Sequence, residues 1–422
     1  MKKHLLRALF ILSFLGLIFL VSACSVEISQ TQLVPTRTAA PPTDTPAPTL
    51  TPTDTPTQPP TLTPTATQPG DPTATASPTP TPTVPFLFPT VGTDLQNFSG
   101  QSATGLQGRM IFLATLADGT QAVLSFEPGT GTLSALFVTE PNTKAWILSA
   151  SVASDASGIL LSYAPPPPPG KPSYGYTDQY VLRPDGQLDP VLLRTEDVEA
   201  MFGSFFTPAM DYVYYSYFFA DNTAPSGFRY HIYRAPYKAG SGAAIGASAG
   251  VGTPELVVEN AYWERMSADG TKMAYVTFGD QDYDEMFVSN ADGSNPVRVL
   301  DPAQFPTIDA PFFSPDNQYL YFSAVSDTGT PTPLAWWEKL MGVHIASAHT
   351  VPSDFWRVSL VDGSAQQITD LKAQGMFGDF SPDGTQIAFI TSSGLYVMQP
   401  DGSGLVQLLE ASTLYGNIEW VP

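Results

Sequence analysis

From about Gln107 to Pro422, apolar and aromatic residues alternate with polar ones in short runs that are separated by turn-forming residues. This period of two, broken at short intervals, is typical of many short β-strands. The pattern is plainest near the C-terminus, where it predicts a unit of four strands. The expected strands are a first strand ending at Phe380, then Gln386–Ile390, Leu395–Met398 and Val406–Leu409.

Two tight turns connect these four strands in pairs. Pro382-Asp383-Gly384 joins the first strand to the second, and Asp401-Gly402 joins the third to the fourth. Glycine accepts a positive φ and aspartate bonds back to the local backbone, so an Asp-Gly pair suits such turns. The unit recurs four more times, twice in degenerate form, with first turns near Asp155, Ala209, Asp269 and Asp316.

The turn sequences resemble the repeat of TolB-type β-propellers. Residues 380–384 are Phe-Ser-Pro-Asp-Gly and residues 401–403 are Asp-Gly-Ser, which match the early and late turns of that repeat. The resemblance covers residues 107–422, about three quarters of the chain. It implies a propeller that acts as an interaction scaffold at the cell envelope, and it implies no particular chemistry.

The strand count predicts how the ring closes. Gly416–Pro422 is a sixth first strand that no turn follows, whereas Gly108–Ala114, Ala122–Glu127 and Thr132–Phe137 are three strands without a first. The two fragments complete each other. We therefore expect an all-β, six-bladed β-propeller of four-stranded blades, in which both terminal strands share one blade and leave no open edge there.

Long loops predict which face of the propeller binds. Loops between the second and third strands share one face with the connections between blades, and most long insertions fall there: Ala164–Asp178, Phe218–Phe228, Phe278–Asp284 and Val325–Ser353. Long loops on a rigid scaffold often hold function, so we expect binding on this long-loop face. The candidate binding residues are Tyr174, Tyr176, Phe218, Phe219, Trp336, Trp337 and His344.

The 325–353 insertion contains a predicted short amphipathic helix. Leu334, Trp337, Leu340 and Met341 fall at helical spacing within residues 333–344. This segment either packs onto the propeller face or offers an apolar patch to a partner, and the sequence leaves both open.

The first 23 residues have the organisation of a secretory signal, with basic residues before an apolar run over residues 8–21. The ending Val21-Ser22-Ala23-Cys24 resembles the lipobox of bacterial lipoproteins, which implies that Cys24 becomes the lipidated first residue of the mature chain. Cys24 is the only cysteine, so no disulfide framework explains it. The alternative is an uncleaved anchor, for which this run is short, since a spanning helix needs about 20 apolar residues.

Residues 24–100 are predicted to be a disordered stalk rich in Thr and Pro between the signal (1–23) and the propeller (107–422). Fully extended, it could reach on the order of 200 Å. Loss of Lys2, Lys3 and Arg7 with the signal leaves 15 basic against 39 acidic residues, a net charge of −24. Such a surface repels nucleic acid and anionic headgroups. We expect an exported monomer, held at the outer face of the cell membrane by its lipid.

Motifs for catalysis and metal binding are weak in this sequence. Residues 246–250 match G-x-S-x-G but lie in a Gly/Ala-rich loop rather than between a strand and a helix. His344 and His349 are five residues apart, which does not fit a zinc helix. Asp280, Asp282 and Asp284 resemble the start of a calcium loop, but Glu285 stands where the loop needs glycine. We expect no cofactor and no resident metal.

Two functional hypotheses follow. The favoured one is a non-catalytic propeller that binds an envelope protein, peptide or glycan. The rival is a propeller enzyme of lyase or glycosidase type, with its active site in the central funnel. A funnel lined by apolar and small residues would favour binding, and converging Asp, Glu, His or Arg side chains would favour catalysis.

Overall fold

In the computed structural model, every regular secondary-structure element of the described residues is a β-strand. None of them forms a helix long and apolar enough to cross a membrane. The described residues are 86, 88–167, 177–193, 199–221, 223–224, 227–237, 252–278, 284–302, 304–305, 307–325 and 351–422.

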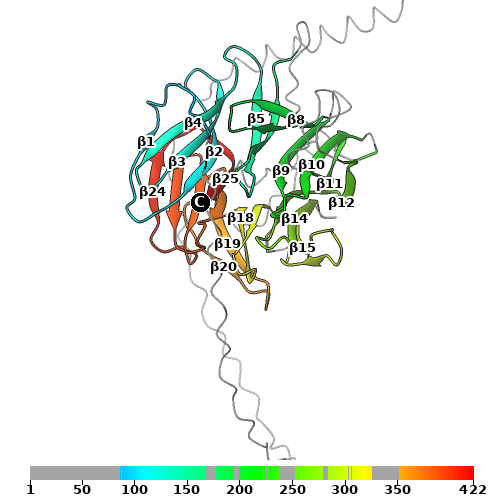
Figure 1. Cartoon of the computed structure of the whole chain (residues 1–422). Helices are drawn as coiled ribbons and strands as arrows, with labels where there is room; N and C mark the ends of the chain where they lie inside the picture. Colours follow the sequence, from blue (N-terminus) through cyan, green and yellow to red (C-terminus); the bar gives the residue numbers. More distant parts are fainter. Residues whose placement is uncertain are drawn as a thin grey trace, which may run out of the picture. The chain divides into compact units, whose positions relative to one another are not determined.

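Six antiparallel sheets form a ring around a common centre (Figure 1), which confirms the predicted six-bladed propeller. Blade 1 contains β25 (Leu414–Val421), β2 (Arg109–Thr115), β3 (Gln121–Glu127) and β4 (Thr132–Val138). Blade 2 contains β5 (Trp146–Val152), β6 (Ile159–Ala164), β7 (Asp178–Leu182) and β8 (Leu188–Leu192). Blade 3 contains β9 (Ala200–Phe206), β10 (Tyr212–Ala220), β11 (Phe228–Pro236) and β12 (Glu255–Glu259).

The other three blades follow in chain order. Blade 4 contains β13 (Ala261–Met266), β14 (Lys272–Phe278), β15 (Asp284–Asn290) and β16 (Val297–Arg298). Blade 5 contains β17 (Ile308–Phe313), β18 (Tyr319–Val325), β19 (Ser353–Ser359) and β20 (Ala365–Gln367). Blade 6 contains β21 (Phe377–Phe380), β22 (Ile387–Thr391), β23 (Gly394–Met398), β24 (Val406–Glu410) and a fifth strand, β1 (Ser99–Gly100).

The alternation along each second strand divides its side chains between two neighbouring blades. In β18, Leu320 and Phe322 enter the core shared with blade 4, whereas Tyr321 enters the core shared with blade 6. Successive side chains of a strand point to opposite faces, and both faces of these strands are covered, so the sequence there is almost continuously apolar. Six such cores, one at each junction of adjacent blades, hold the ring together.

The Asp-Gly turns form as predicted. At the first turn of blade 6, the Asp383 carboxylate accepts hydrogen bonds from the Ser381 hydroxyl at 2.6 Å and the Thr385 amide at 3.1 Å. Gly384 adopts a φ of 71°, which glycine accepts without strain. Aspartates 269 and 316 accept the same serine bond at 2.6 Å, so the repeat encodes one turn structure.

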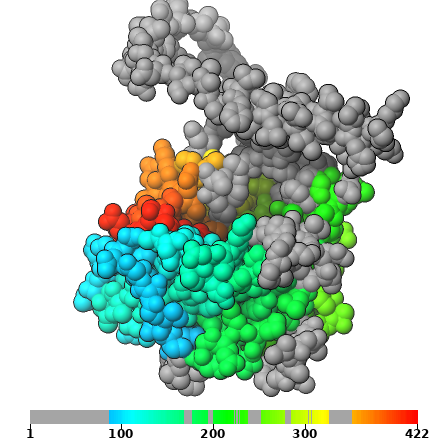
Figure 2. All heavy atoms as spheres, turned by 90° about the horizontal axis from the view of Figure 1, so that it is seen from above, coloured from blue at the N-terminus to red at the C-terminus, as the bar shows by residue number. Residues whose placement is uncertain are grey.

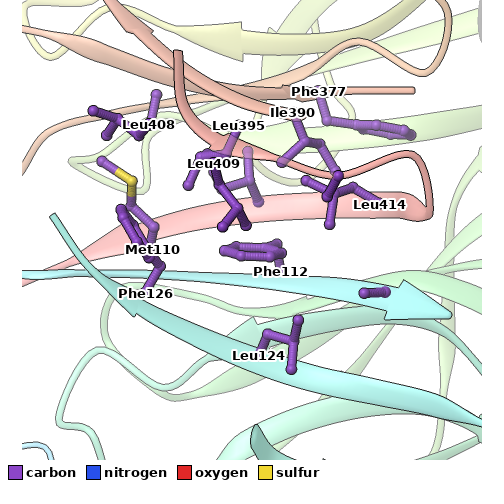
Figure 3. Close-up of a cluster of buried hydrophobic side chains, with 14 of the residues drawn as sticks. Met110, Phe112, Leu124, Phe126, Phe377, Ile390, Leu395, Leu408, Leu409 and Leu414 are labelled. Carbon is purple, nitrogen blue, oxygen red and sulfur yellow. The ribbon is translucent and has the colours of Figure 1, made fainter. Parts of the chain in front are cut away.

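Blade 1 closes the ring as predicted, with β25 paired to β2. Met110 lies opposite Trp420 and Phe112 opposite Ile418, and all four side chains are buried. Figure 3 shows the core between blades 1 and 6, where Met110 and Phe112 lie close to Leu409. Burial of each such side chain contributes roughly 1.5–3 kcal/mol, so the closure is a main source of stability.

Residues 88–106, the strap, lie along the outer edges of the closing blades, which the sequence did not predict. Val91 bridges to Ala135 of β4, and β1 pairs with β24 through Ser99 and Glu410. Phe88 is buried in the core between blades 1 and 2. The blue strap borders red C-terminal residues in Figure 2, and the folded unit therefore begins before Gln107.

Candidate functional site

The first strands of the six blades surround a central cavity of about 630 Å³. Its lining comes mostly from the beginnings and middles of these strands, together with Phe218 and Tyr230 from the β10–β11 hairpin. Both places lie toward the long-loop face. The cavity walls contain Trp146, Leu148, Ser149, Ala200, Phe202, Gly203, Phe218, Tyr230, Trp263, Glu264, Arg265, Ala310, Pro311, Gln374, Gly375, Phe377, Gly378, Ser392, Leu414, Tyr415, Gly416 and Asn417.

Five of the six first strands carry a β-bulge beside this cavity. A residue at four of these bulges has a left-handed φ: Gly203 at 64°, Gly416 at 71°, Trp263 at 56° and Ala310 at 49°. A bulge bends its strand and re-aims its side chains. In Trp263 and Ala310 the left-handed φ strains the backbone, because neither residue is glycine. Backbone strain of this kind concentrates at ligand sites.

Aromatic rings from three different blades meet at the cavity. Trp263 of blade 4 lies 5.6 Å from Phe377 of blade 6 and 6.4 Å from Phe202 of blade 3, measured between ring centroids. Phe202 in turn contacts Tyr230 at 5.8 Å. Each of these pairs is edge-to-face. The wall is therefore an aromatic surface of the kind that holds apolar or cationic groups.

An ion pair crosses the cavity between opposite blades. Arg265 of blade 4 lies 3.5 Å from the Glu419 carboxylate of blade 1, and both side chains are largely buried. Glu419 also accepts a hydrogen bond from the Val152 amide of blade 2 at 2.5 Å. Asp379 of blade 6 accepts one from the Trp420 amide of blade 1 at 2.9 Å. These two carboxylates thus join neighbouring first strands. Both are also close enough to Arg265 for its positive charge to lower their pKa values.

Glu264 has a different environment from the other two acids. Its side chain is 98 % buried, and one carboxyl oxygen, Oε2, accepts a hydrogen bond from the Ser216 hydroxyl. The other oxygen, Oε1, has no hydrogen-bond partner within the described part of the chain. Burial raises the pKa of Glu264 to about 8, against smaller lowering contributions from Ser216 and Arg265. Burial raises the pKa of Asp379 to about 6 and raises that of Glu419.

Of the three aspartates that resemble the start of a calcium loop, the structure describes only Asp284. Asp280 and Asp282 lie outside the described residues, and Asp284 begins β15. Its carboxylate accepts the Tyr262 hydroxyl at 3.3 Å and the Ile308 amide at 3.2 Å. Burial and the neighbouring Asp309 raise the pKa of Asp284 to about 7. The described residues contain no group of three or more metal-ligating side chains.

Of the predicted binding residues, the structure brings only Phe218 to the cavity. Phe219, next in β10, packs against His231 with 4.8 Å between ring centroids. The remaining candidates lie outside the described residues: Cys24, Tyr174, Tyr176, Trp336, Trp337 and His344. Sequence reasoning missed the cavity wall itself, although a signal exists. Trp263, Glu264 and Arg265 lie two to four residues before the turn residue Ser267, where the first strand of the repeat faces the ring centre.

Comparisons with known proteins found no matching family and several partly similar proteins. No family model matches the chain. An uncharacterized protein of Agrobacterium fabrum is 26 % identical over 171 residues, which are 40 % of this chain, and the chain spans about half the length of that relative (49 %).

Several solved structures are similar in fold. A putative TolB from Agrobacterium tumefaciens is 18 % identical with a TM-score of 0.49, covering 75 % of this chain and 99 % of its own. TolB from Acinetobacter baumannii is 12 % identical with a TM-score of 0.48, covering 75 % and 67 %. A puromycin-hydrolyzing peptidase of Mycobacterium tuberculosis is 17 % identical with a TM-score of 0.45, covering 77 % and 50 %.

Proposed function

We propose that this protein is an exported, lipid-anchored binding protein whose propeller receives a peptide segment of an envelope partner in its central cavity. The observation that carries the proposal is the aromatic cavity of about 630 Å³ at the ring centre. Ligand sites are usually concave, mostly apolar and provided with a few polar groups. The polar groups here include Ser149, Gln374 and Asn417.

Three carboxyls and Arg265 converge at the cavity, which is the feature expected of the enzyme hypothesis, but their hydrogen bonds favour binding. A glycosidase needs two carboxyls that both face the substrate. Glu419 and Asp379 are instead bonded to the backbone of neighbouring first strands. Within the described part of the chain, Glu264 is the one of these three acids with a carboxyl oxygen that has no hydrogen-bond partner. This arrangement supports recognition rather than the two-acid chemistry of a glycosidase, one of the two enzyme types in the rival hypothesis.

The wall chemistry favours a peptide over a glycan. Sugar recognition needs many hydrogen-bonding side chains around an aromatic platform, whereas most of this lining is aromatic, aliphatic or glycine. Such a surface accepts apolar stems of side chains, with peptide polar groups reaching the few amides and hydroxyls at the wall. A disordered segment of a partner could thread into the cavity from the long-loop face.

A display selection tests the peptide proposal directly. Random peptides are selected on the folded protein, and their affinities are measured for the wild type, Phe218→Ala and Val361→Ala. Phe218 is half-buried at the cavity, whereas Val361 is 78 % exposed in the β19–β20 turn and is the matched control. Phe218→Ala should weaken selected peptides about tenfold or more, while Val361→Ala leaves them unchanged. Peptides insensitive to Phe218, or glycans that bind in their place, would overturn it.

The anchor is tested separately at Cys24. Cys24→Ala should abolish labelling by a fatty-acid probe and change the distribution between membrane and soluble fractions. If the wild-type chain takes up no lipid label and still stays in the membrane fraction, it is held by an uncleaved N-terminal helix, and the lipoprotein proposal fails.

A further inference from the structure

The buried charges at the cavity do not balance. Three carboxyl groups, those of Glu264, Asp379 and Glu419, lie in the field of Arg265, which lowers the pKa of each. Arg265 is the single cationic side chain among the described residues that line the cavity. If all three carboxyls were ionised, the group would hold two uncompensated negative charges. Buried charges without partners are strongly disfavoured.

Of the three carboxyl groups, that of Glu264 has the least compensation for its negative charge. Glu419 has its arginine and the Val152 amide, and Asp379 has the Trp420 amide. Glu264 belongs to the residues that line the cavity, and its Oε1 is buried without a hydrogen-bond partner in the described residues. A Cβ placed on Gly203 of the facing strand β9 would lie 3.9 Å from this oxygen. The glycine therefore leaves room at the oxygen that a side chain would otherwise restrict.

Aromatic residues line the same cavity as Glu264. Trp263 precedes Glu264 in β13, and its bulge geometry turns both residues toward the cavity. Phe202 and Tyr230 form edge-to-face contacts within the same wall. A cation within about 6 Å of an aromatic face gains roughly 0.5–2 kcal/mol, and more where water is excluded. A carboxylate beside such rings completes a cage for a positively charged group.

We propose that the cavity selects an organic cation, a protonated amine or quaternary ammonium on an apolar stem, with Glu264 as its counter-ion. The inference rests on the proposed function, because it names the chemistry of the ligand that the same cavity takes. In a peptide this group would be a lysine side chain or a terminal amine. An anionic ligand is disfavoured, since only Arg265 could receive it and Glu419 already pairs with Arg265.

Cation binding should then displace a proton from Glu264. Around neutral pH the empty site holds Glu264 in its acid form, because burial raises its pKa to about 8. The groups that face it are the Ser216 hydroxyl on β10 and Arg265 on its own strand, and Asp379 and Glu419 lie beyond the arginine. The Tyr230 and Tyr262 hydroxyls are neutral in this range, since burial raises the pKa of both. The cation takes the place of the proton.

Calorimetry with two matched probes tests the inference on the full chain. Phenethyltrimethylammonium carries a permanent positive charge, and 2-phenylethanol has the same aromatic stem without charge. At about pH 8 the cation should bind at least tenfold more tightly. Below that pH its affinity should fall up to tenfold per pH unit, as deprotonation of Glu264 becomes harder. Its binding heat should also vary with the ionisation enthalpy of the buffer, which reports the released proton.

Glu264→Gln separates charge recognition from folding. Glutamine matches the shape of the protonated acid, so we expect the variant to fold and to bind 2-phenylethanol unchanged. It should lose at least tenfold in affinity for the cation, together with the pH dependence and the proton release. Glu410→Gln removes an exposed carboxylate from the outer strand β24 and should behave as the wild type.

The outcomes distinguish this inference from the proposed function. If both probes bind equally, and both weaken in Phe218→Ala, the cavity binds ligands but the selection for cations is wrong. If Glu264→Gln retains tight, pH-dependent cation binding, Glu264 is not the counter-ion. If neither probe binds while selected peptides still depend on Phe218, the peptide proposal survives and this inference fails.

Discussion

At the scale of single residues, desolvation is the main cause of the raised pKa values of the acids at the centre of the propeller. Glu264 lies beside aromatic rings and a glycine rather than beside a cation of its own, and burial therefore favours its neutral form. Arg265 lowers the pKa of all three acids, and Asp379 and Glu419 additionally accept hydrogen bonds from the backbone amides of neighbouring blades, which offsets part of the burial. All three acids thus join neighbouring blades, and among them Glu264 alone keeps a carboxyl oxygen without a hydrogen-bond partner in the described residues.

The raised pKa of Glu264 makes stability depend on pH. The native state holds this proton up to about pH 8, whereas the unfolded chain releases it near the ordinary value of 4.5. Between these values the native state binds more protons than the unfolded state, so stability falls as pH rises and the full loss is reached above about pH 8. Glu264→Gln removes this loss, on the order of a few kcal/mol.

Thermal melting across pH checks this prediction. Wild type and Glu264→Gln should melt together near pH 4, and the variant should become progressively more stable as pH rises to about 8. A constant difference between the two melting curves over this range would show that Glu264 does not hold its proton in the native state.

At the scale of elements, the bulges of the first strands determine the shape of the cavity. Gly416 in β25 has a φ of 71°, and a Cβ added there would lie 2.9 Å from Leu113 Cδ1 and 3.1 Å from the Leu148 carbonyl oxygen. The glycine therefore allows both the left-handed backbone and the close approach of blade 2. Strands without such a bulge would direct their side chains elsewhere.

Gly416→Ala tests the two requirements together, and Gly119→Ala is its control. Gly119 also has a positive φ, 84°, but a Cβ there has no neighbour within 4 Å. The control should lose roughly 1 kcal/mol of unfolding free energy from backbone strain alone. Gly416→Ala should lose about 1–3 kcal/mol more from the clash. Equal losses in denaturant unfolding would show that the neighbours of Gly416 move aside.

The strands were predictable because their signals are local. Each blade repeats a two-residue alternation and an Asp-Gly turn, so neighbouring residues determine the structure. The cavity was not predictable in the same way, because its wall takes a few residues from each blade and only ring closure brings Trp146, Trp263 and Tyr415 together. Phe218 was found because it borders a long loop. The strap was missed because its apolar residues are isolated within a polar, turn-rich segment.

At the scale of the whole molecule, the ring is closed by one non-covalent strand pairing, that of β25 with β2, which we call the seam. β25 pairs with β2 across the two most distant parts of the propeller sequence, and it supplies Ile418, Glu419 and Trp420 to three different contacts. The seam thus joins the closing core to the ion pair that crosses the cavity. Loss of the seam would expose strand edges and remove the acid partner of Arg265.

Deletion of Ile418–Pro422 should therefore destabilise the whole propeller. Removal of one large buried side chain costs about 2–5 kcal/mol, and two are lost here, Ile418 and Trp420. Each kcal/mol shifts the melting temperature of a larger domain by about 2–4 °C, so we expect a decrease of at least about 10 °C in calorimetry. Ile418→Val is the mild control. An unchanged melting temperature for the deletion would contradict the seam.

The strap also determines how the propeller responds to a mechanical load. A pull applied through the residues before Phe86 reaches the contacts of Phe88, the Val91–Ala135 bridge and the β1–β24 pairing before it reaches the seam. Those contacts are few, so they should yield first. In a single-molecule stretching experiment, release of residues 88–106 should let this segment extend to roughly 60–70 Å, so the gain is that length less the distance it spans when folded, while the ring stays folded. Release of the strap would thus let the chain lengthen under tension while the ring remains closed and the cavity keeps its shape.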